Sequence, residues 1–433
     1  MKKHKGKILV LFLAVLLVSL LSCENPFLKK MLVEEEKGNT VPEKPQEPEN
    51  PAVPVPKHTV SFSVEGAGGT LKAKADGIAE TGVSPITVEQ GKTVTFTAEP
   101  AAGYVVKEWK VDGIVVTGNT ENSYIHTVTK AVDVKVSFDA PFVEGGASLI
   151  LSPDKLTIGV RVRTADGSSV TVEGCEETTL ASSTGTTLTA QGIVVILKGK
   201  IIELYCDNNQ LTALNVQGLN ALEKLYCAKN QLTALDVQGL STLQYLGCYN
   251  NQLTALNVQG LSTLKGLGCS GNQLTALDVQ GLSVLQSLAC NNNQLTALNV
   301  QGLSALGELA CNNNQLTALD VQGLNALERL YCTNNQLTAL NVQGCTALYR
   351  LYCWGNRLNA QAFIKIFNDL PKWGSGYDKW CILYTEETGS TEGNHTDFTS
   401  PAELKAAFEN AKYVKRWSMC KYNTDGSLGW IEI

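Results

Sequence analysis

The feature that most constrains this chain is a 21-residue unit that recurs eight times between residues 201 and 358. Each copy carries a cysteine, and an asparagine follows three residues after it. The cysteines are Cys206, Cys227, Cys248, Cys269, Cys290, Cys311, Cys332 and Cys353, and the asparagines are Asn209, Asn230, Asn251, Asn272, Asn293, Asn314, Asn335 and Asn356. A fixed period of this length indicates a solenoid, in which each coil packs only on its neighbours, rather than a globule around one core.

One coil, residues 222–240, illustrates how the unit is expected to fold. It follows the leucine-rich repeat pattern L-x-x-L-x-L-x-x-N-x-L, with cysteine in place of the third leucine. Leu225, Tyr226 and Cys227 predict a short strand with Leu225 and Cys227 inward and Tyr226 outward. The asparagine is expected to satisfy backbone groups left unpaired where the chain turns. Strands about 4.8 Å apart would form a parallel sheet on the concave face.

With cysteine at that position, the unit resembles the cysteine-ladder repeats of the internalin J type in bacterial surface proteins. The resemblance covers residues 200–358, and the period, the asparagine and the cysteine agree in all eight copies. In that family the cysteines form an internal ladder. The resemblance implies a cell-surface adhesin or protein-binding module without enzymatic activity.

The N-terminus predicts export. Four lysines precede a 14-residue apolar run, residues 8–21, which is too short to span a membrane and typical of a signal peptide over residues 1–22. The run ends Leu20-Leu21-Ser22-Cys23, which resembles the lipoprotein cleavage box and implies lipid attachment at Cys23. The alternative is an ordinary signal peptide with an incidental cysteine. We expect an exported, membrane-anchored bacterial lipoprotein, in the outer membrane and exposed on the cell surface.

Three further segments surround the repeats. Residues 23–57 are expected to form a lipid-anchored linker. Proline recurs every third residue from Pro42 to Pro54 with glutamates between, which favours an extended polyproline stalk; the alternative is a disordered linker. Residues 58–139 alternate apolar and polar side chains, which predicts a small all-β module. Its glycine and aromatic pattern resembles the divergent B-repeat modules of bacterial surface proteins, and Trp109 is expected in its core. The sequence leaves open whether this module binds a ligand or acts as a spacer.

Both ends of the solenoid require caps, because a terminal coil has no neighbour to cover it. Residues 140–200 are the predicted β-rich N-terminal cap, whose last strand, 193–197, is expected to pair with the first repeat strand. Residues 359–433 are the predicted α/β C-terminal cap, with one helix capped by Asn359. A second helix is expected to start with a capping box from Ser400 to Glu403, with Pro401 at its first helical position. The expected fold class is a leucine-rich repeat solenoid with a small all-β module and β/α caps.

Copies of the repeat differ mainly at outward positions of the sheet. Aromatic and charged residues gather at its two ends, and glycine, alanine and serine occupy its middle. The candidate binding face comprises Tyr205, Tyr226, Tyr245, Tyr249, Arg329, Tyr331, Arg350, Tyr352 and Trp354. Tyrosine, tryptophan and arginine are the residues that anchor interfaces, so the sequence favours a host or neighbouring-cell surface protein as partner of a monomeric chain. The alternatives are a glycan ligand, or a passive envelope scaffold whose tyrosines only pack along the sheet.

Other chemistry is not expected. Residues 201–360 contain six Lys or Arg against eight Asp or Glu, so no basic footprint for nucleic acid is present. The ladder cysteines show no C-x-x-C pair and the repeats contain no histidine, which argues against a metal site.

The cysteines are expected to remain free, buried thiols, because thiols about 4.8 Å apart do not match disulfide geometry. Cys345 replaces a repeat leucine and is expected in the core, whereas pairing of Cys381 with Cys420 stays open. Cys381, His395 and Asp397 are the components of a conceivable catalytic arrangement, but they lie outside any motif. The sequence therefore predicts a non-enzyme without cofactors.

Overall fold

The computed structural model describes residues 54–374, 379–386, 392–423 and 430–433. The predicted signal peptide, Cys23 and most of the linker lie outside the described residues. The chain divides after Val55 into two units, and the description below concerns the second. Among the described residues, no helix combines the length and apolar character needed to cross a membrane.

The N-terminal module folds into nine strands, because apolar side chains alternate along them. They are β1 (Lys57–Glu65), β2 (Gly69–Ala75), β3 (Ile78–Thr81), β4 (Ile86–Glu89), β5 (Thr93–Pro100), β6 (Val105–Val111), β7 (Ile114–Val115), β8 (Ser123–Thr127) and β9 (Val132–Asp139). They form two sheets, in the orders β4-β1-β9-β6-β7 and β3-β2-β5-β8. Trp109 is fully buried, as predicted, and its indole N–H donates to the Glu121 carbonyl at 3.0 Å.

The N-terminal cap contains six strands, β10 (Gly146–Ile150), β11 (Thr157–Thr164), β12 (Val170–Glu173), β13 (Thr179–Leu180), β14 (Gly185–Thr189) and β15 (Val194–Lys198). The expectation that strand 193–197 pairs with the first repeat strand, β16 (Ile201–Tyr205), is wrong. β15 pairs with β10 and β12, whereas β16 pairs antiparallel with β11 and parallel with the next repeat strand. Both edges of each strand are therefore occupied by other partners.

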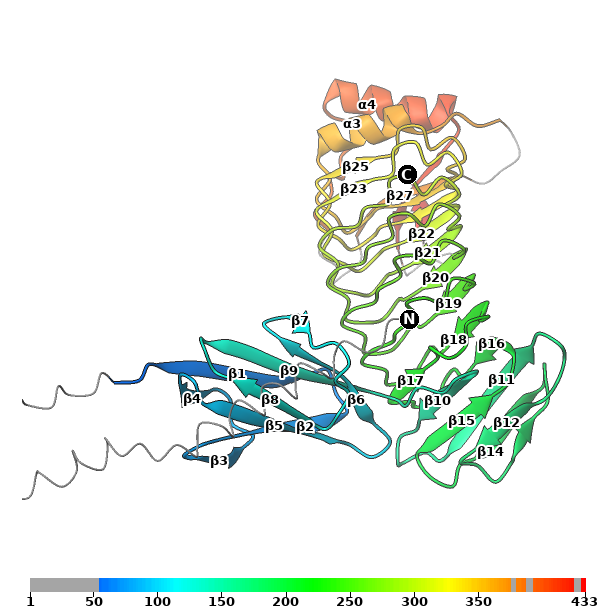
Figure 1. Ribbon diagram of the computed structural model, residues 1–433. Coiled ribbons are helices and arrows are strands. Elements are labelled where there is room, and N and C mark those ends of the chain that lie inside the picture. The colour runs from blue at the N-terminus through cyan, green and yellow to red at the C-terminus, as the bar shows by residue number, and fades with distance from the viewer. Residues whose placement is uncertain (1–53, 375–378, 387–391, 424–429) are drawn as a thin grey trace, which may run out of the picture. The chain divides into compact units, whose positions relative to one another are not determined.

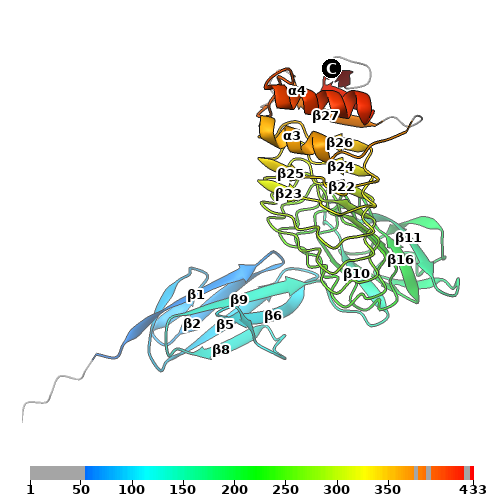
Figure 2. The same cartoon turned by 90° about the horizontal axis from the view of Figure 1, so that it is seen from above.

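The repeats form one continuous parallel sheet, visible in Figures 1 and 2. Its strands after β16 are β18 (Lys224–Tyr226), β19 (Tyr245–Gly247), β20 (Gly266–Gly268), β21 (Ser287–Ala289), β22 (Glu308–Ala310), β24 (Arg329–Tyr331) and β26 (Arg350–Tyr352). From β16 to β26, paired residues on neighbouring strands lie 21 positions apart in the sequence. Three short strands lie elsewhere in the coils: β17 (Ala213–Asn215), β23 (Ala318–Asp320) and β25 (Ala339–Asn341). The repeat leucines, valines and cysteines, Cys345 included, form the core between the sheet and the opposite side of each coil.

The C-terminal cap begins with helix α3 (Ala360–Asp369), where the Asn359 side chain accepts a hydrogen bond from the Ala362 N–H at 2.9 Å. Strands β27 (Trp380–Thr385), β28 (Ser418–Tyr422) and β29 (Trp430–Glu432) extend the repeat sheet beyond β26. In the sequence between β27 and β28 lie α4 (Ala402–Glu409) and the π-helix η1 (Asn410–Val414). Helix α4 lies beside α3 in Figures 1 and 2.

The predicted capping box at the start of α4 is wrong. Pro401 is the N-cap residue and makes no side-chain capping hydrogen bond. Its backbone is extended, so the helix starts at Ala402, and Glu403 occupies the second helical position instead of the third. The box requires the N-cap side chain and the third helical residue to bond reciprocally, and this geometry does not arise here.

Candidate binding face

The asparagines hold the repeat strands in register from inside the coils. The Asn251 amide donates to the carbonyls of Cys248 and Cys227, both at 3.0 Å, and its oxygen accepts from the Leu232 N–H at 3.0 Å. The same three bonds recur at Asn272, Asn293, Asn314, Asn335 and Asn356. Each asparagine side chain therefore links two coils and fixes the position of their strands relative to each other.

The caps complete this asparagine ladder at both ends. Asn209 exchanges two hydrogen bonds of 2.8 Å with the backbone of Gly159 in β11. Asn394, from the C-terminal cap, donates to the Cys353 carbonyl at 2.9 Å and accepts from the Leu358 N–H at 2.8 Å. Sequence reasoning missed Asn394, because it lies in a non-repeating loop where no periodicity marks it.

The ladder thiols are buried and unpaired, and all the cysteines described are free, including Cys381 and Cys420. Burial raises the pKa of Cys248 and of Cys311 to about 12, and it raises the pKa of Cys381 well above the ordinary value. The thiolate, which is the nucleophilic form, is therefore disfavoured at these positions. Among the described residues, no group of three or more His, Cys, Asp or Glu is placed to hold a metal ion.

The conceivable Cys-His-Asp arrangement in the C-terminal cap does not form a relay. The His395 ring lies 2.6 Å from the backbone carbonyl of Asp397, while the Asp397 carboxylate accepts hydrogen bonds from Thr399. These contacts close a local turn, and Cys381 is buried inside the cap. A catalytic arrangement would require the carboxylate to orient the histidine toward an accessible nucleophile.

The N-terminal shoulder of the face comprises Tyr205, Tyr226, Tyr245 and Tyr249. The Arg161 guanidinium lies 3.9 Å from the Tyr205 ring centre, and the Tyr205 and Tyr226 rings stack at 4.9 Å. Tyr226 leans over Gly247, where an added methyl group would lie 2.8 Å from the ring, and Tyr245 leans over Gly266 in the same way at 2.9 Å. These glycines therefore make room for tyrosines that pack along the sheet.

The Glu203 carboxylate at this shoulder has its partners within the protein. Glu203 lies 2.7 Å from Arg163 and 3.2 Å from Lys224, and it accepts a hydrogen bond from the Tyr205 hydroxyl at 3.0 Å. Lys224 also lies 5.6 Å from the Tyr245 ring. Among the four tyrosines of this shoulder, Tyr249 keeps the most exposure, at 39%. The packing alternative raised by the sequence thus fits Tyr205 and Tyr226 better than a binding role.

The C-terminal shoulder comprises Arg329, Tyr331, Arg350, Tyr352 and Trp354. Tyr331 and Tyr352 lie on neighbouring strands, are half-buried, and meet edge to face at 5.0 Å. Arg329 and Arg350 pair side by side in the same register. Trp354 stacks at 4.6 Å on Tyr422 of the C-terminal cap, so it forms part of the contact between repeats and cap.

Positive charge at this shoulder is only partly balanced. Arg329 forms an ion pair with Glu308 at 3.1 Å, whereas Arg350 forms none with any residue that the structure describes. The guanidinium of Arg350 lies 5.1 Å from the Trp380 ring and 5.7 Å from the Tyr349 ring. The Nε atoms of both arginines are buried without a hydrogen-bond partner. The Arg329 guanidinium lies 5.5 Å from the Tyr349 ring, so aromatic rings flank two neighbouring guanidinium groups, of which only that of Arg329 has a carboxylate partner.

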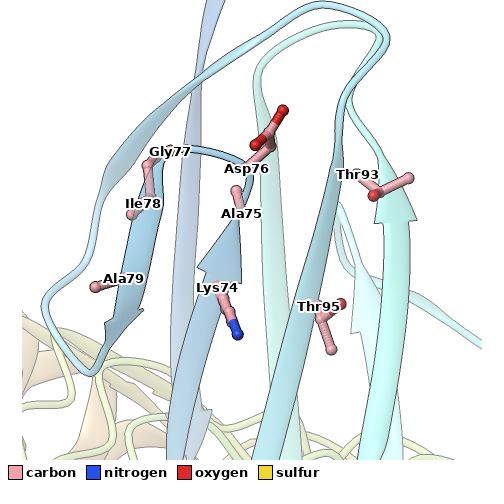
Figure 3. A pocket seen from close by; sticks show the side chains of 8 residues that line it. All are labelled: Lys74, Ala75, Asp76, Gly77, Ile78, Ala79, Thr93 and Thr95. Carbon is pink, nitrogen blue, oxygen red and sulfur yellow. The ribbon is translucent and has the colours of Figure 1, made fainter.

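A separate depression lies on the N-terminal module, with a volume of about 670 Å³. Figure 3 shows its lining side chains, which come from the β2–β3 hairpin and from β5. Its acidic group, Asp76, already pairs with Lys92 at 2.7 Å. Its remaining polar side chains, Lys74, Thr93 and Thr95, are sparse and point to no particular ligand.

Comparison with known proteins finds one matching family model and several similar solved structures. Residues 68–141 match the divergent InlB B-repeat domain, which confirms the interpretation of the N-terminal module. A leucine-rich repeat protein of Leptospira interrogans is similar in structure, with 32% identity, 41% of this chain and 49% of that chain covered, and a TM-score of 0.38. The functional domain of InlJ from Listeria monocytogenes, which includes a cysteine ladder, shows 25% identity, 45% and 52% coverage, and a TM-score of 0.28.

A third similar structure is YopM, a leucine-rich effector protein of Yersinia pestis, with 31% identity, 36% and 44% coverage, and a TM-score of 0.32. The chain spans about half the length of these solved structures, between 44% and 52%. A comparison with curated proteins finds no match. The register of the chain's own strands, with its 21-residue offset, shows that the fold is a leucine-rich repeat solenoid.

Proposed function

We propose that this chain is a non-catalytic, lipid-anchored protein of the bacterial surface whose repeat sheet binds a protein partner at the C-terminal shoulder. The observation that carries the proposal is the pair of neighbouring guanidinium groups at Arg329 and Arg350, of which only Arg329 has a carboxylate partner, Glu308 on the preceding strand. A planar guanidinium is suited to fork-like hydrogen bonding with a carboxylate. An acidic side chain of the partner would supply the missing counter-charge at Arg350.

The tyrosines beside these arginines supply the apolar part of the proposed contact. Tyr331 and Tyr352 are held edge to face, so little side-chain freedom is lost when a partner covers them. Rigid tyrosines and arginines near the centre of an interface carry most of its binding energy. Toward the middle of the sheet, Ala310 pairs with Tyr331 and presents only a methyl group, which leaves space for side chains of the partner.

Export and anchoring belong to the same proposal. The apolar run before Cys23 supports a lipoprotein, and two or more acyl chains would hold it stably in a membrane. Metabolic labelling with an alkynyl fatty acid tests this step: the wild-type chain is expected to incorporate the label, and Cys23→Ser is expected to abolish incorporation. Equal labelling of both proteins would refute lipidation at Cys23.

The binding proposal is tested with the full chain purified in detergent. Surface proteins of candidate host and neighbouring cells are passed over wild type, a Tyr331→Ala/Tyr352→Ala variant, and a Tyr413→Ala control. Tyr413 is 69% exposed on η1, outside the face. Each shoulder tyrosine is expected to contribute about 2 kcal/mol, so the double variant should lose a partner that the control retains. Retention of the same proteins by all three chains would contradict the proposal.

A further inference from the structure

A shallow, open cavity lies at the opposite end of the sheet, where the N-terminal cap extends it. Strands β14 and β11 continue the sheet beyond β16, and the cavity over these three strands has a volume of about 420 Å³. Its lining residues are Gly159, Val160, Arg161, Gly185, Thr186, Thr187, Tyr205 and Asp207. Only Tyr205 of these belongs to the face expected from the repeats.

Two glycines create the space. Gly185 pairs with Arg161, and Gly159 pairs with Thr187. The side chains of Arg161 and Thr187 therefore each stand opposite a glycine, which has no side chain. A methyl group added at Gly185 would meet nothing within 4 Å, and one added at Gly159 would meet only the Asn209 side-chain oxygen at 3.9 Å. The space above these two glycines is therefore open. Above Gly247, by contrast, the Tyr226 ring fills the space.

The positive group of the cavity is held in place without being neutralised. The exposed Arg161 lies with its guanidinium carbon 3.9 Å from the Tyr205 ring centre, and Tyr205 in turn stacks on Tyr226. Arg163 on the same strand is engaged by Glu203, whereas Arg161 forms no ion pair with any of the residues described. Its terminal nitrogens remain available to an anion, and the aromatic stack restricts the side chain before a ligand arrives.

The other polar groups of the lining indicate which kind of anionic ligand the cavity suits. Thr187 offers a hydroxyl, and Asp207 offers a carboxylate of which one oxygen accepts the Ala228 N–H at 2.7 Å. These groups match the hydroxyls of a sugar ring, and the Tyr205 ring provides an apolar surface of the kind that a sugar ring can cover. The volume lies within the range of small-ligand pockets, roughly 300 to 1,000 Å³.

We infer that this cavity binds a carboxylate-bearing sugar, with Arg161 receiving the carboxylate and Thr187 and Asp207 receiving ring hydroxyls. The site is distinct from the protein-binding C-terminal shoulder, and each can fail without the other. The two would allow one molecule to engage a glycan and a protein at opposite ends of its sheet.

The test measures binding of glucuronate, N-acetylneuraminate, glucose and acetate to the full chain in detergent by ligand-observed NMR. Glucuronate or N-acetylneuraminate should bind at least tenfold more tightly than glucose or acetate. Arg161→Ala should weaken that binding at least tenfold, while Arg357→Ala, at an exposed arginine beyond the cavity, should leave it unchanged.

A second variant separates binding from folding. Gly185→Val should fold, because open space surrounds that position, and should abolish binding by filling the cavity without changing any charge. Thermal unfolding monitors both variants. The inference is overturned if no acidic sugar binds at millimolar concentration, if glucose or acetate binds equally well, or if folded Arg161→Ala and Gly185→Val retain wild-type affinity.

Discussion

At the scale of single residues, the asparagine of each coil contributes more than its small size indicates. Asn293 donates to the carbonyls of Cys269 and Cys290, at 3.0 and 3.1 Å, and accepts from the Leu274 N–H at 3.0 Å. Replacing it with alanine leaves these buried backbone groups without partners, each at a cost of about 1–3 kcal/mol. We therefore expect Asn293→Ala to lower the free energy of unfolding by about 3 kcal/mol, measured by urea denaturation followed by circular dichroism.

The matched control is Thr296→Ala, three residues along the same coil at an exposed position. It is expected to change the free energy of unfolding by less than about 0.5 kcal/mol, as surface substitutions usually do. Equal effects of the two substitutions would show that the asparagine ladder does not hold the coils together.

The buried thiols predict a loss of stability at alkaline pH. Folding raises the pKa of Cys248 and of Cys311 to about 12, whereas an unfolded cysteine titrates near 8.5. Above about pH 8.5 the unfolded chain therefore loses protons that the folded chain keeps, and unfolding becomes more favourable. Each such thiol is expected to lower the free energy of unfolding by about 1.4 kcal/mol per pH unit between pH 9 and 11.

Urea midpoints at pH 7, 9 and 10.5 measure this slope. A Cys248→Ala/Cys311→Ala variant should be less stable than wild type at pH 7, yet its stability should fall less steeply with pH. The slope should differ by about 2.7 kcal/mol per pH unit, the share of two thiols. Parallel slopes would mean that these thiols titrate alike in both states.

At the scale of the coil, one turn position carries asparagine and aspartate in alternate coils, which separates the negative charges. The first side chain of this turn accepts the N–H two residues later, and successive coils use Asn257, Asp278, Asn299 and Asp320 in turn. Strands about 4.8 Å apart would bring carboxylates on adjacent coils within roughly 5 Å. The alternation keeps them about 10 Å apart, beyond the Debye length of about 8 Å at physiological salt.

Asn299→Asp places a third exposed carboxylate between Asp278 and Asp320 while keeping the turn acceptor. Repulsion of about 1 kcal/mol from each neighbour should lower the free energy of unfolding by about 1–2 kcal/mol. The loss relative to wild type should shrink in 1 M salt, where screening is stronger, and Asp278→Asn/Asp320→Asn should restore stability. A loss that persists at high salt and in the triple variant would have a steric origin instead.

The sequence predicted the elements whose signals are local or periodic. The coil strands follow from Leu225, Tyr226 and Cys227, and helix α3 follows from Asn359 and its apolar stripe. Features that depend on three-dimensional neighbours could not be predicted in this way. The partners of β15 depend on which strand edges are already occupied, and Asn394 joins the ladder from a loop without periodicity.

The sequence predicted which residues of the candidate face point outward, but only partly how their side chains pack. Outward positions follow from alternation along the strand, so most shoulder residues lie on the sheet strands as the repeat indicated. Tyr249 and Trp354 lie two residues beyond the ends of β19 and β26. The lean of Tyr226 over Gly247 and the stacking of Trp354 on Tyr422 depend on side-chain directions that periodicity does not encode. Arg161 was missed because the cap has no repeat to align it with Tyr205.

At the scale of the whole molecule, near-identical coils predict that the solenoid tolerates loss of one complete unit. Removing residues 281–301 joins two coils through the same sequence that joins all others, so every ladder residue keeps a partner. Because stability in such arrays is nearly a sum of repeat and neighbour contributions, the shortened chain should fold and be only moderately less stable. Circular dichroism and size-exclusion chromatography measure whether the shortened chain is folded and monodisperse.

The control removes residues 281–290, half a coil, and this deletion should prevent folding. Equal outcomes for both deletions would contradict the claim that whole coils are interchangeable units.

The most direct test of the central claim asks which face of the solenoid touches the partner. A photo-crosslinking amino acid is placed either at Ala310, on the sheet beside Tyr331, or at Thr296, an exposed position of a coil outside the sheet strands. The full chain is then irradiated with the protein partner that wild type retains and the Tyr331→Ala/Tyr352→Ala variant loses. Binding through the sheet predicts a cross-link from position 310 and none from position 296. A cross-link from position 296 alone, or equally from both, would contradict it.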